Sequence, residues 1–317
     1  MFIEREITAS KYRSMAKRNF TRRQFMATMA AGAGTVFVGN SIKAIPSGIK
    51  PDMFDPFQTV TLGKTGIKTT LLGMGTGYSG YNRSSNITRA GVAEAVIRTA
   101  YERGIRYFDC ADSYGTHPFT AAALKGIPRE NYTLGTKMWI TSGGIPDSDK
   151  GYPEVVIDRF RKELNTDYFD IVQLHCMTEG TWTEKYKRYL DGLENLKAKK
   201  IIRAHGVSVH SYDALITASE SPWVDVIHVR INPFGDAMDK KDPALVVPVI
   251  EKFHNAGKGV IGMKLIGGGS LRNDPQKVEE SLKFVLGLGT VDLIIIGFEL
   301  PEQIDNYINR IKQVQKS

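Results

Sequence analysis

The sequence predicts a single (β/α)8 barrel, and three observations lead to that prediction. Short apolar runs of β-type residues alternate with longer amphipathic runs, and there are eight of the short runs. Their starts lie about 24 to 38 residues apart, the length of a strand, a helix and two loops. No Gly-x-Gly-x-x-Gly pattern follows an early strand, as it does in open dinucleotide-binding sheets. Eight parallel strand–helix units in roughly 270 residues fit one closed barrel.

A small hairpin is expected ahead of the barrel. Residues 58–62 and 67–69 resemble two short strands, and Gly66 stands at the turn between them. Such a hairpin would close the bottom of the barrel, where the parallel strands begin. Chemistry is then expected at the opposite end, where the strands finish.

The barrel strands and the helices between them follow from the periodicity of apolar residues. The last helical segment places Ile304, Ile308 and Ile311 on one face, and the first places Val92 and Val96 in the same way. The expected strands are residues 70–74, 107–109, 133–136, 171–174, 202–207, 226–231, 260–263 and 293–296.

The first 44 residues are expected to be a signal rather than part of the fold. They carry eight basic and two acidic residues, and residues 25–38 after the basic cluster are uncharged. Fourteen helical residues span about 21 Å, short of the roughly 30 Å hydrocarbon core, so no permanent membrane span is expected. A basic region, a short apolar region and Ala44 before Ile45-Pro46 are typical of an export signal cleaved after Ala44.

Residues 21–26, Thr-Arg-Arg-Gln-Phe-Met, resemble the twin-arginine (Tat) export signal of bacteria. The resemblance implies export of the folded protein by the Tat machinery, to the periplasm. A basic tail lying on a membrane surface is the alternative, and both Met1 and Met15 remain possible translation starts.

Composition narrows the classes of partner and cofactor. The formal charge of the chain is +8, of which the first 44 residues supply +6, so the remainder gives no reason to expect a nucleic-acid partner. Two cysteines exclude a disulfide framework and an iron–sulfur cluster held by four cysteines of the chain. The expected organisation is a signal at residues 1–44, a linker at 45–57 and the barrel at 58–317.

Four polar residues with chemical capacity follow three neighbouring strands. Asp109 ends the second strand and Tyr114 lies five residues later, Lys137 follows the third strand, and His175 follows the fourth. Each is costly to bury alone, so a shared network is expected to hold them together at the carboxyl end of the barrel.

These residues make residues 58–316 similar to the aldo-keto reductases. The spacing from Asp109 to Tyr114, Thr-Lys-Met-Trp at 136–139 and Gln-Leu-His at 173–175 all match the family pattern. The resemblance implies an NAD(P)-dependent oxidoreductase that interconverts a carbonyl and an alcohol, with aldehydes and ketones, sugar-derived ones included, as substrates. Asp109, Tyr114, Lys137 and His175 would be its catalytic residues.

The resemblance also assigns a role to each member of this tetrad. Tyr114 would be the general acid and base, and the adjacent ammonium of Lys137 would lower the phenol's pKa. Asp109 would hold Lys137 in place by an ion pair. His175 would donate a hydrogen bond that orients the carbonyl.

Further positions are implied for the cofactor. His228 stands where the family usually has the glutamine that holds the nicotinamide carboxamide, and Met263 stands where many members have a stacking aromatic residue. The remaining implied cofactor residues are Gly75, Thr76 and Ser208, then Lys264, Gly267 and Gly268 in a glycine-rich loop, and Gly297, Glu302 and Asn306 after the last strand.

The choice between NAD(H) and NADP(H) stays open. Members selective for NADP commonly carry basic residues at the positions of Ile296 and Glu302, which are apolar and acidic here. Charge complementarity with the 2′-phosphate is therefore weak, unless Lys264 or Arg272 supplies the positive charge.

The sequence also allows predictions for the substrate contacts, the two cysteines and metal binding. Tyr78, Trp139 and Phe234 are expected at the barrel mouth as substrate contacts. Cys110 and Cys176 each follow a tetrad residue, so strand alternation points both away from the barrel interior, as free buried thiols. No metal site is expected. The alternative is that the protein is a non-catalytic homologue that binds the cofactor and acts as a sensing or interaction protein.

Overall fold

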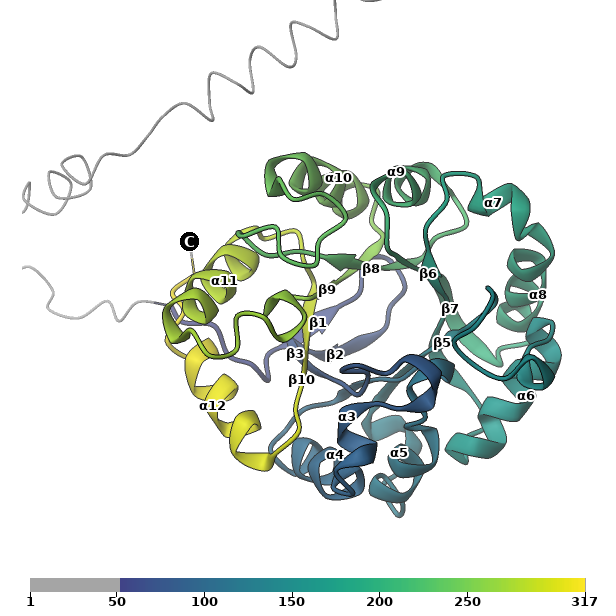
Figure 1. Cartoon of the computed structure of the whole chain (residues 1–317), viewed down its shortest axis with the longest axis horizontal. Helices are drawn as coiled ribbons and strands as arrows, with labels where there is room; N and C mark the ends of the chain where they lie inside the picture. Colours follow the sequence, from purple (N-terminus) through teal and green to yellow (C-terminus); the bar gives the residue numbers. More distant parts are fainter. Residues whose placement is uncertain (1–51, 317) are drawn as a thin grey trace, which may run out of the picture. The chain divides into compact units, whose positions relative to one another are not determined.

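A computed structural model describes residues 52–316, so the predicted signal at 1–44 and residues 45–51 of the predicted linker lie outside the described residues. Eight parallel strands form a closed barrel in the order β10-β3-β4-β5-β6-β7-β8-β9. Helices surround the strands on the outside (Figure 1). The predicted (β/α)8 fold class is confirmed.

The barrel strands lie close to their predicted positions. The first strand differs, because residues 68–70 belong to the hairpin strand β2 and the barrel strand begins at Leu72. Thr70 pairs with Thr59 of the hairpin, which removes it from the barrel. The strands are β3 Leu72–Gly75, β4 Tyr107–Asp109, β5 Thr133–Met138, β6 Phe169–Met177, β7 Ile202–Val209, β8 Val226–Arg230, β9 Gly259–Met263 and β10 Leu293–Gly297.

Three of the helices begin at a side chain that caps the backbone. Ser211, Asp242 and Asp274 accept hydrogen bonds from backbone N–H groups at the starts of α9, α10 and α11. The helices are α3 Asn86–Arg89, α4 Ala93–Glu102, α5 His117–Ala123, α6 Pro153–Leu164, α7 Trp182–Lys185, α8 Lys187–Ala198, α9 Tyr212–Glu220, α10 Pro243–Asn255, α11 Pro275–Gly287 and α12 Pro301–Ile311. Short 3-10 turns are η1 Tyr81–Arg83, η2 Asp112–Tyr114, η3 Arg129–Asn131, η4 Asp147–Asp149 and η5 Gly267–Gly269.

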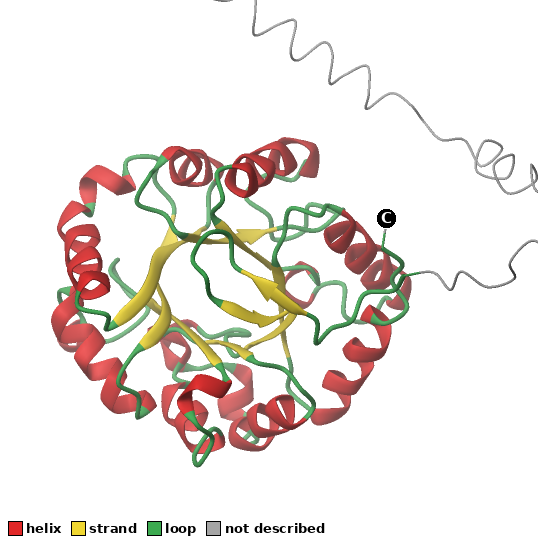
Figure 2. Cartoon of the chain, turned by 180° about the vertical axis from the view of Figure 1, so that it is seen from behind, coloured by secondary structure: helices red, strands yellow, loops and turns green. Residues whose placement is uncertain are grey.

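The predicted hairpin is confirmed and covers the end of the barrel where the strands begin (Figure 2). Strand β1 (Thr59–Thr61) pairs antiparallel with β2 (Lys68–Thr70). Leu62 and Ile67, between the two strands, are fully buried and pack against interior side chains of the barrel. The hairpin therefore plugs one end with apolar side chains, and polar chemistry is left to the other end.

Between residues 52 and 316, no helix combines the length and the apolar character needed to cross a bilayer.

Candidate active site

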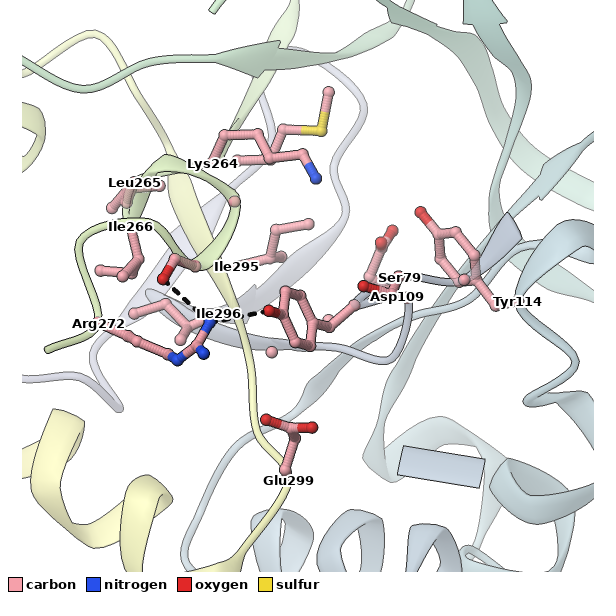
Figure 3. Close-up of a pocket in the computed structure, with 18 of the residues that line it drawn as sticks. Ser79, Asp109, Tyr114, Lys264, Leu265, Ile266, Arg272, Ile295, Ile296 and Glu299 are labelled. Carbon is pink, nitrogen blue, oxygen red and sulfur yellow. Dashed lines mark hydrogen bonds between the residues drawn. The ribbon is translucent and has the colours of Figure 1, made fainter. Parts of the chain in front are cut away.

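A pocket of about 990 Å³ opens at the carboxyl end of the barrel. Its lining includes Asp109, Tyr114, Lys137 and His175, so the structure brings together the four residues predicted at the ends of β4, β5 and β6. Figure 3 shows Asp109 and Tyr114 on one side of the pocket and Lys264 on another. The volume is at the upper end of the usual range for small-molecule and cofactor sites.

Asp109 and Lys137 form a buried ion pair. Lys137 Nζ lies 2.5 Å from Asp109 Oδ1 and 2.6 Å from Oδ2, and it also donates to the Cys110 carbonyl at 3.2 Å. Both side chains are almost inaccessible to solvent. Burial raises the pKa of Asp109, but the charge of Lys137 and the nearby His228 outweigh it and lower the pKa to about 2. Asp109 is therefore ionised at neutral pH.

Tyr114 ends η2 and its ring packs against two glycines. A Cβ at Gly77 would lie 2.2 Å from the Tyr114 ring, and one at Gly80 would lie 2.6 Å from it. The ring can occupy this place only because neither residue has a side chain. Lys137 Nζ lies 5.3 Å from the ring centroid.

The predicted effect of Lys137 on Tyr114 is not what this structure shows. Desolvation by the surrounding protein, followed by the charge of Asp109, raises the pKa of Tyr114 well above its usual value of 10. The ammonium of Lys137 is bound by Asp109 and by the Cys110 carbonyl, and it does not offset these two effects. The phenol is accordingly protonated at neutral pH and can donate.

His175 is the third polar group on the pocket wall. Its ring lies edge-on to Tyr114 and to Trp139, with centroids 5.4 Å and 5.2 Å away, and Ser113 Oγ is 3.4 Å from its Nδ1. Burial, followed by the charge of Lys137, lowers the pKa of His175 well below 6.5. A neutral imidazole carries one N–H, which makes it a hydrogen-bond donor rather than a cation.

Two partly exposed arginines around the buried Asp112 hold the turn that carries Tyr114. Asp112 is almost fully buried and accepts from Arg159 at 2.8 and 3.1 Å and from Arg83 at 3.2 Å. Sequence reasoning missed this cluster, because its members lie 29 and 47 residues apart along the chain. No local pattern in the sequence signals it.

Most of the predicted cofactor and substrate residues reach the pocket. Lys264 has a positive φ of 61° and is partly buried, and burial followed by the charge of Arg230 lowers its pKa. Arg272 Nη1 donates to the Tyr78 hydroxyl at 3.0 Å and so links the loops after β9 and β3 (Figure 3). The predicted residues that line the pocket, besides the tetrad, are Gly75, Tyr78, Trp139, Ser208, Met263, Lys264, Gly268, Gly297, Glu302 and Asn306.

Four predicted residues do not line the pocket. Thr76 is buried with its N–H and hydroxyl bonded to the Asp109 carbonyl, and His228 is buried with Nε2 3.0 Å from Asp109 Oδ1. Gly267 is buried in the turn behind its neighbour Gly268. Phe234 lies beneath the ammonium of Lys277, in a loop held by Asn232. In each case local hydrogen bonding or packing turns the residue away from the cavity. The spacing of residues along the sequence does not reveal these contacts.

The two thiols are free but face different ways. Cys110 is buried with Sγ 3.5 Å from Thr120 Oγ1 of α5, as strand alternation predicts. Cys176 instead lines the pocket, so that prediction is wrong for Cys176. Strand β6 is irregular between Leu174 and Met177, and Cys176 has φ 58°, which inverts the alternation.

Other lining residues were not predicted at all. Tyr81 packs edge-on against Trp139 at 5.6 Å, and His210 Nε2 lies 3.4 Å from Cys176 Sγ. Among residues 52–316, no group of three or more His, Cys, Asp or Glu side chains is arranged to hold a metal ion.

Comparison with known proteins identifies the family. Residues 71–284, more than half of the chain, match the sequence model of the Aldo/keto reductase family. The chain belongs to this family. The probable aldo-keto reductase 1 of Glycine max is 35% identical over 185 residues, which cover 52% of this chain and 51% of that protein. The chain thus spans about half the length of the curated relatives it matches.

Solved aldo-keto reductase structures share the fold. A putative aldo-keto reductase from Pseudomonas aeruginosa superimposes with a TM-score of 0.66 at 22% identity, over 85% of this chain and 99% of that one. An aldo-keto reductase from Klebsiella pneumoniae in complex with NADPH superimposes with a TM-score of 0.61 at 17% identity, over 84% and 92% of the two chains. At these identities the likeness concerns the barrel alone.

Proposed function

We propose that this aldo/keto reductase interconverts a carbonyl and an alcohol with a nicotinamide nucleotide, and that Tyr114 exchanges the proton. The observation that carries the proposal is the buried Asp109–Lys137 ion pair beside Tyr114 and His175, on the wall of a pocket of about 990 Å³. Family membership supports the same reaction class.

The bound nucleotide supplies or accepts the hydride. In the reducing direction negative charge builds on the carbonyl oxygen, and donors must hold or protonate that oxygen. Tyr114 is protonated at neutral pH and donates its proton, while neutral His175 donates a hydrogen bond that orients the carbonyl. The ammonium of Lys137 stabilises the charge that develops on the Tyr114 oxygen, and Asp109 holds Lys137 in place.

The residues around the pocket fit such a nucleotide. Gly268 and Gly269 line the pocket with φ angles of 66° and 101°, so this turn presents bare backbone to the cavity, as phosphate-binding loops do. Lys264 and Arg272 add positive charge near that turn. We assign the nicotinamide end to Ser208 and Met263, the pyrophosphate to the glycine turn and Lys264, and the adenosine end to Glu302 and Asn306.

Both NAD(H) and NADP(H) belong to the proposal. Glu299 and Glu302 line the outer part of the pocket and oppose a 2′-phosphate, while Arg272 attracts one. Arg310 also lines this part, but its guanidinium is paired with Glu279 at 3.0 Å. The Klebsiella relative was solved with NADPH. Parallel titrations with the two reduced nucleotides decide between them.

The substrates that we propose are aldehydes and ketones, sugar-derived ones included. Trp139 and Tyr81 form an aromatic wall beside His175, which favours substrates with an apolar face next to the carbonyl. A panel of aliphatic, aromatic and sugar-derived carbonyls, followed by the absorbance of the reduced nucleotide, tests the reaction. Nucleotide binding without turnover of any carbonyl or alcohol would favour the non-catalytic alternative.

We further propose that the Tat machinery exports the protein, with cleavage after Ala44. The support is Arg22-Arg23 before an uncharged run of fourteen residues. Replacing both arginines by lysine should retain the protein in the cytoplasm, whereas Arg13→Lys with Arg18→Lys should not. Exported protein that keeps Met1, as measured by mass spectrometry, would contradict the cleavage.

A further inference from the structure

His228 is a buried histidine that the mechanism above does not use. It lies in the middle of β8, is 1% exposed and does not line the pocket. Its Nε2 lies 3.0 Å from Asp109 Oδ1, the same oxygen that accepts from Lys137 Nζ. The two atoms are close, but the N–H bond does not point along the line between them. Neither ring nitrogen of His228 has a well-aligned hydrogen bond among the described residues. A histidine buried this completely needs a polar partner, and Asp109 is the one within reach.

The charged and titratable groups around His228 come from the neighbouring strands. Asp109 on β4 and Lys137 on β5 act on its ring, and His228 in turn acts on His175 of β6. The adjacent strands β7 and β9 place Ser208 and Ile261 in register beside it. Burial lowers the pKa of His228 more than Asp109 raises it, so the ring is neutral at neutral pH. A neutral ring that faces a carboxylate carries its proton on the facing nitrogen, here Nε2.

We propose that His228 is a positioning residue for the catalytic ion pair, because it shares Asp109 Oδ1 with Lys137 and thereby limits how much of the Lys137 charge Asp109 neutralises. The inference rests on the proposed function, since its consequence is greater stabilisation of charge on the Tyr114 oxygen.

The electrostatic argument concerns the charge that Tyr114 experiences. The carboxylate of Asp109 opposes ionisation of the Tyr114 phenol, and Lys137 favours it. His228 is a second donor beside Asp109, after Lys137, and its N–H dipole offsets part of the carboxylate's negative charge. The carboxylate then acts less strongly on Tyr114 and holds Lys137 less tightly. Removing that donor leaves Asp109 more strongly paired with Lys137, and charge on the Tyr114 oxygen becomes harder to form.

This role differs from a direct contact with the nucleotide. His228 occupies the position that the family resemblance assigns to the carboxamide, yet its side chain lies behind the pocket wall, against Asp109. A positioning role therefore predicts a change in turnover and in pH dependence, whereas a nucleotide contact predicts a change in nucleotide affinity.

The test compares His228→Leu, which has similar volume and no donor, with His228→Gln, whose amide can still donate. The matched control is His205→Gln. His205 is equally buried on the neighbouring strand β7, but it stacks on Trp223 and bonds Glu194, outside the pocket. Each variant is measured for kcat, nucleotide Kd, unfolding temperature and the pH profile of kcat/KM for carbonyl reduction.

We expect His228→Leu to lower kcat about tenfold or more and to move the alkaline inflection of the profile to higher pH, with nucleotide Kd changed less than about twofold. His228→Gln should keep kcat within about threefold of the wild type, and His205→Gln should leave kcat and the inflection unchanged. If the Leu variant does not fold, His228→Asn takes its place, since its shorter amide does not reach Asp109 and the same losses are expected.

Two kinetic results would overturn the proposal. A rise in nucleotide Kd with unchanged kcat would make His228 a cofactor ligand. The second result is a loss of kcat that is proportional to the loss of unfolding temperature in both the His228 and the His205 variants, while the alkaline inflection of the pH profile stays in place. That result would make His228 a packing residue.

A measurement without substrate separates this inference from the proposed function. In ¹⁵N NMR of the histidine side chains, His228 should show the neutral Nε2–H form, and Asp109→Asn should shift its signals while those of His205 stay in place. Unshifted His228 signals would end the inference even if the protein reduces carbonyls. Shifted signals in a protein that turns over no carbonyl would contradict the proposed function alone.

Discussion

The two ends of this barrel bury different kinds of side chain. Where the strands begin, Leu62 and Ile67 of the hairpin pack against Tyr107 and other interior residues in an apolar plug. Where they finish, Asp109 and Lys137 are equally buried, but as an ion pair on the wall of a pocket. In the plug, burial raises the pKa of the Tyr107 phenol well above 10, whereas the pocket end has unusual backbone conformations next to its polar groups. The comparison predicts that stability and chemistry depend on opposite ends of one barrel.

The largest effect is expected at the pocket end. Tyr114→Phe removes the proposed proton donor and keeps the ring that packs on Gly77, so turnover should fall about 10²- to 10⁴-fold. Nucleotide Kd and the free energy of unfolding should change little. Steady-state kinetics with nucleotide titration and urea unfolding measure all three quantities. Turnover unchanged within a factor of two would refute the role of Tyr114.

The converse effect is expected at the plug. Leu62→Ala leaves a cavity among fully buried side chains and should reduce the free energy of unfolding by about 2–5 kcal/mol. Because Leu62 lies at the opposite end from the pocket, kcat at a temperature where the variant is folded should equal that of the wild type. A loss of kcat as large as that of Tyr114→Phe would break the separation between the two ends.

A smaller effect should follow from crowding the Tyr114 ring. A Cβ added by Gly77→Ala would lie 2.2 Å from that ring, so the ring must move. Displacement of a catalytic group by about 1 Å can cost on the order of 10²-fold in rate, and we expect a loss between about 10- and 100-fold. Gly180→Ala is the control, because its Cβ would meet only ordinary contacts outside the pocket. Equal activities of the two variants would show that the ring position is not critical.

The pH dependence of stability should report the ion pair. The pKa of Asp109 is lowered from 3.8 to about 2 in the folded protein. Its ionised form therefore contributes stability that is present above about pH 4 and is lost as pH falls through about 2. The difference in free energy of unfolding between wild type and Asp109→Asn should shrink over this range when urea unfolding is repeated at each pH. A difference that stays constant would contradict the lowered pKa.

The smallest effect is expected at the outer part of the pocket. Glu302→Lys places a cation where the 2′-phosphate of NADPH is proposed to lie, so the Kd for NADPH should fall about tenfold and that for NADH should stay within about twofold. Glu154→Lys, in the first turn of α6 and away from the pocket, is the control. If Glu302→Lys changes the Kd for NADPH and the Kd for NADH by the same factor, the 2′-phosphate does not lie near residue 302.

The sequence predicts the parts of this molecule that depend on local pattern. The period of apolar runs predicts the eight strands, and the paired segments around Gly66 predict the hairpin. The tetrad residues meet because the carboxyl ends of neighbouring parallel strands share one edge of the barrel. Because the strands close into a barrel in a known order, residues that are far apart in the sequence become neighbours at positions that the strand order predicts.

What the sequence misses depends on contacts between distant residues. The irregularity in β6 that turns Cys176 into the pocket has no mark in the sequence. The raised pKa of Tyr114 depends on burial of the phenol and on the charge of Asp109, which residue spacing does not reveal. The place of His228 behind Asp109 depends in the same way on packing across three strands.

The proposed hydride transfer at the pocket end, with proton exchange at Tyr114, is tested most directly by isotope labelling. The experiment uses nicotinamide nucleotide deuterated at C4, an aldehyde, and mass spectrometry of the alcohol product. We expect one deuterium on the former carbonyl carbon with the wild-type protein and at least about a hundredfold less labelled product per unit time with Tyr114→Phe. No labelled alcohol from the nucleotide-bound wild-type protein across the carbonyl panel, or equal labelling rates by both proteins, would contradict it.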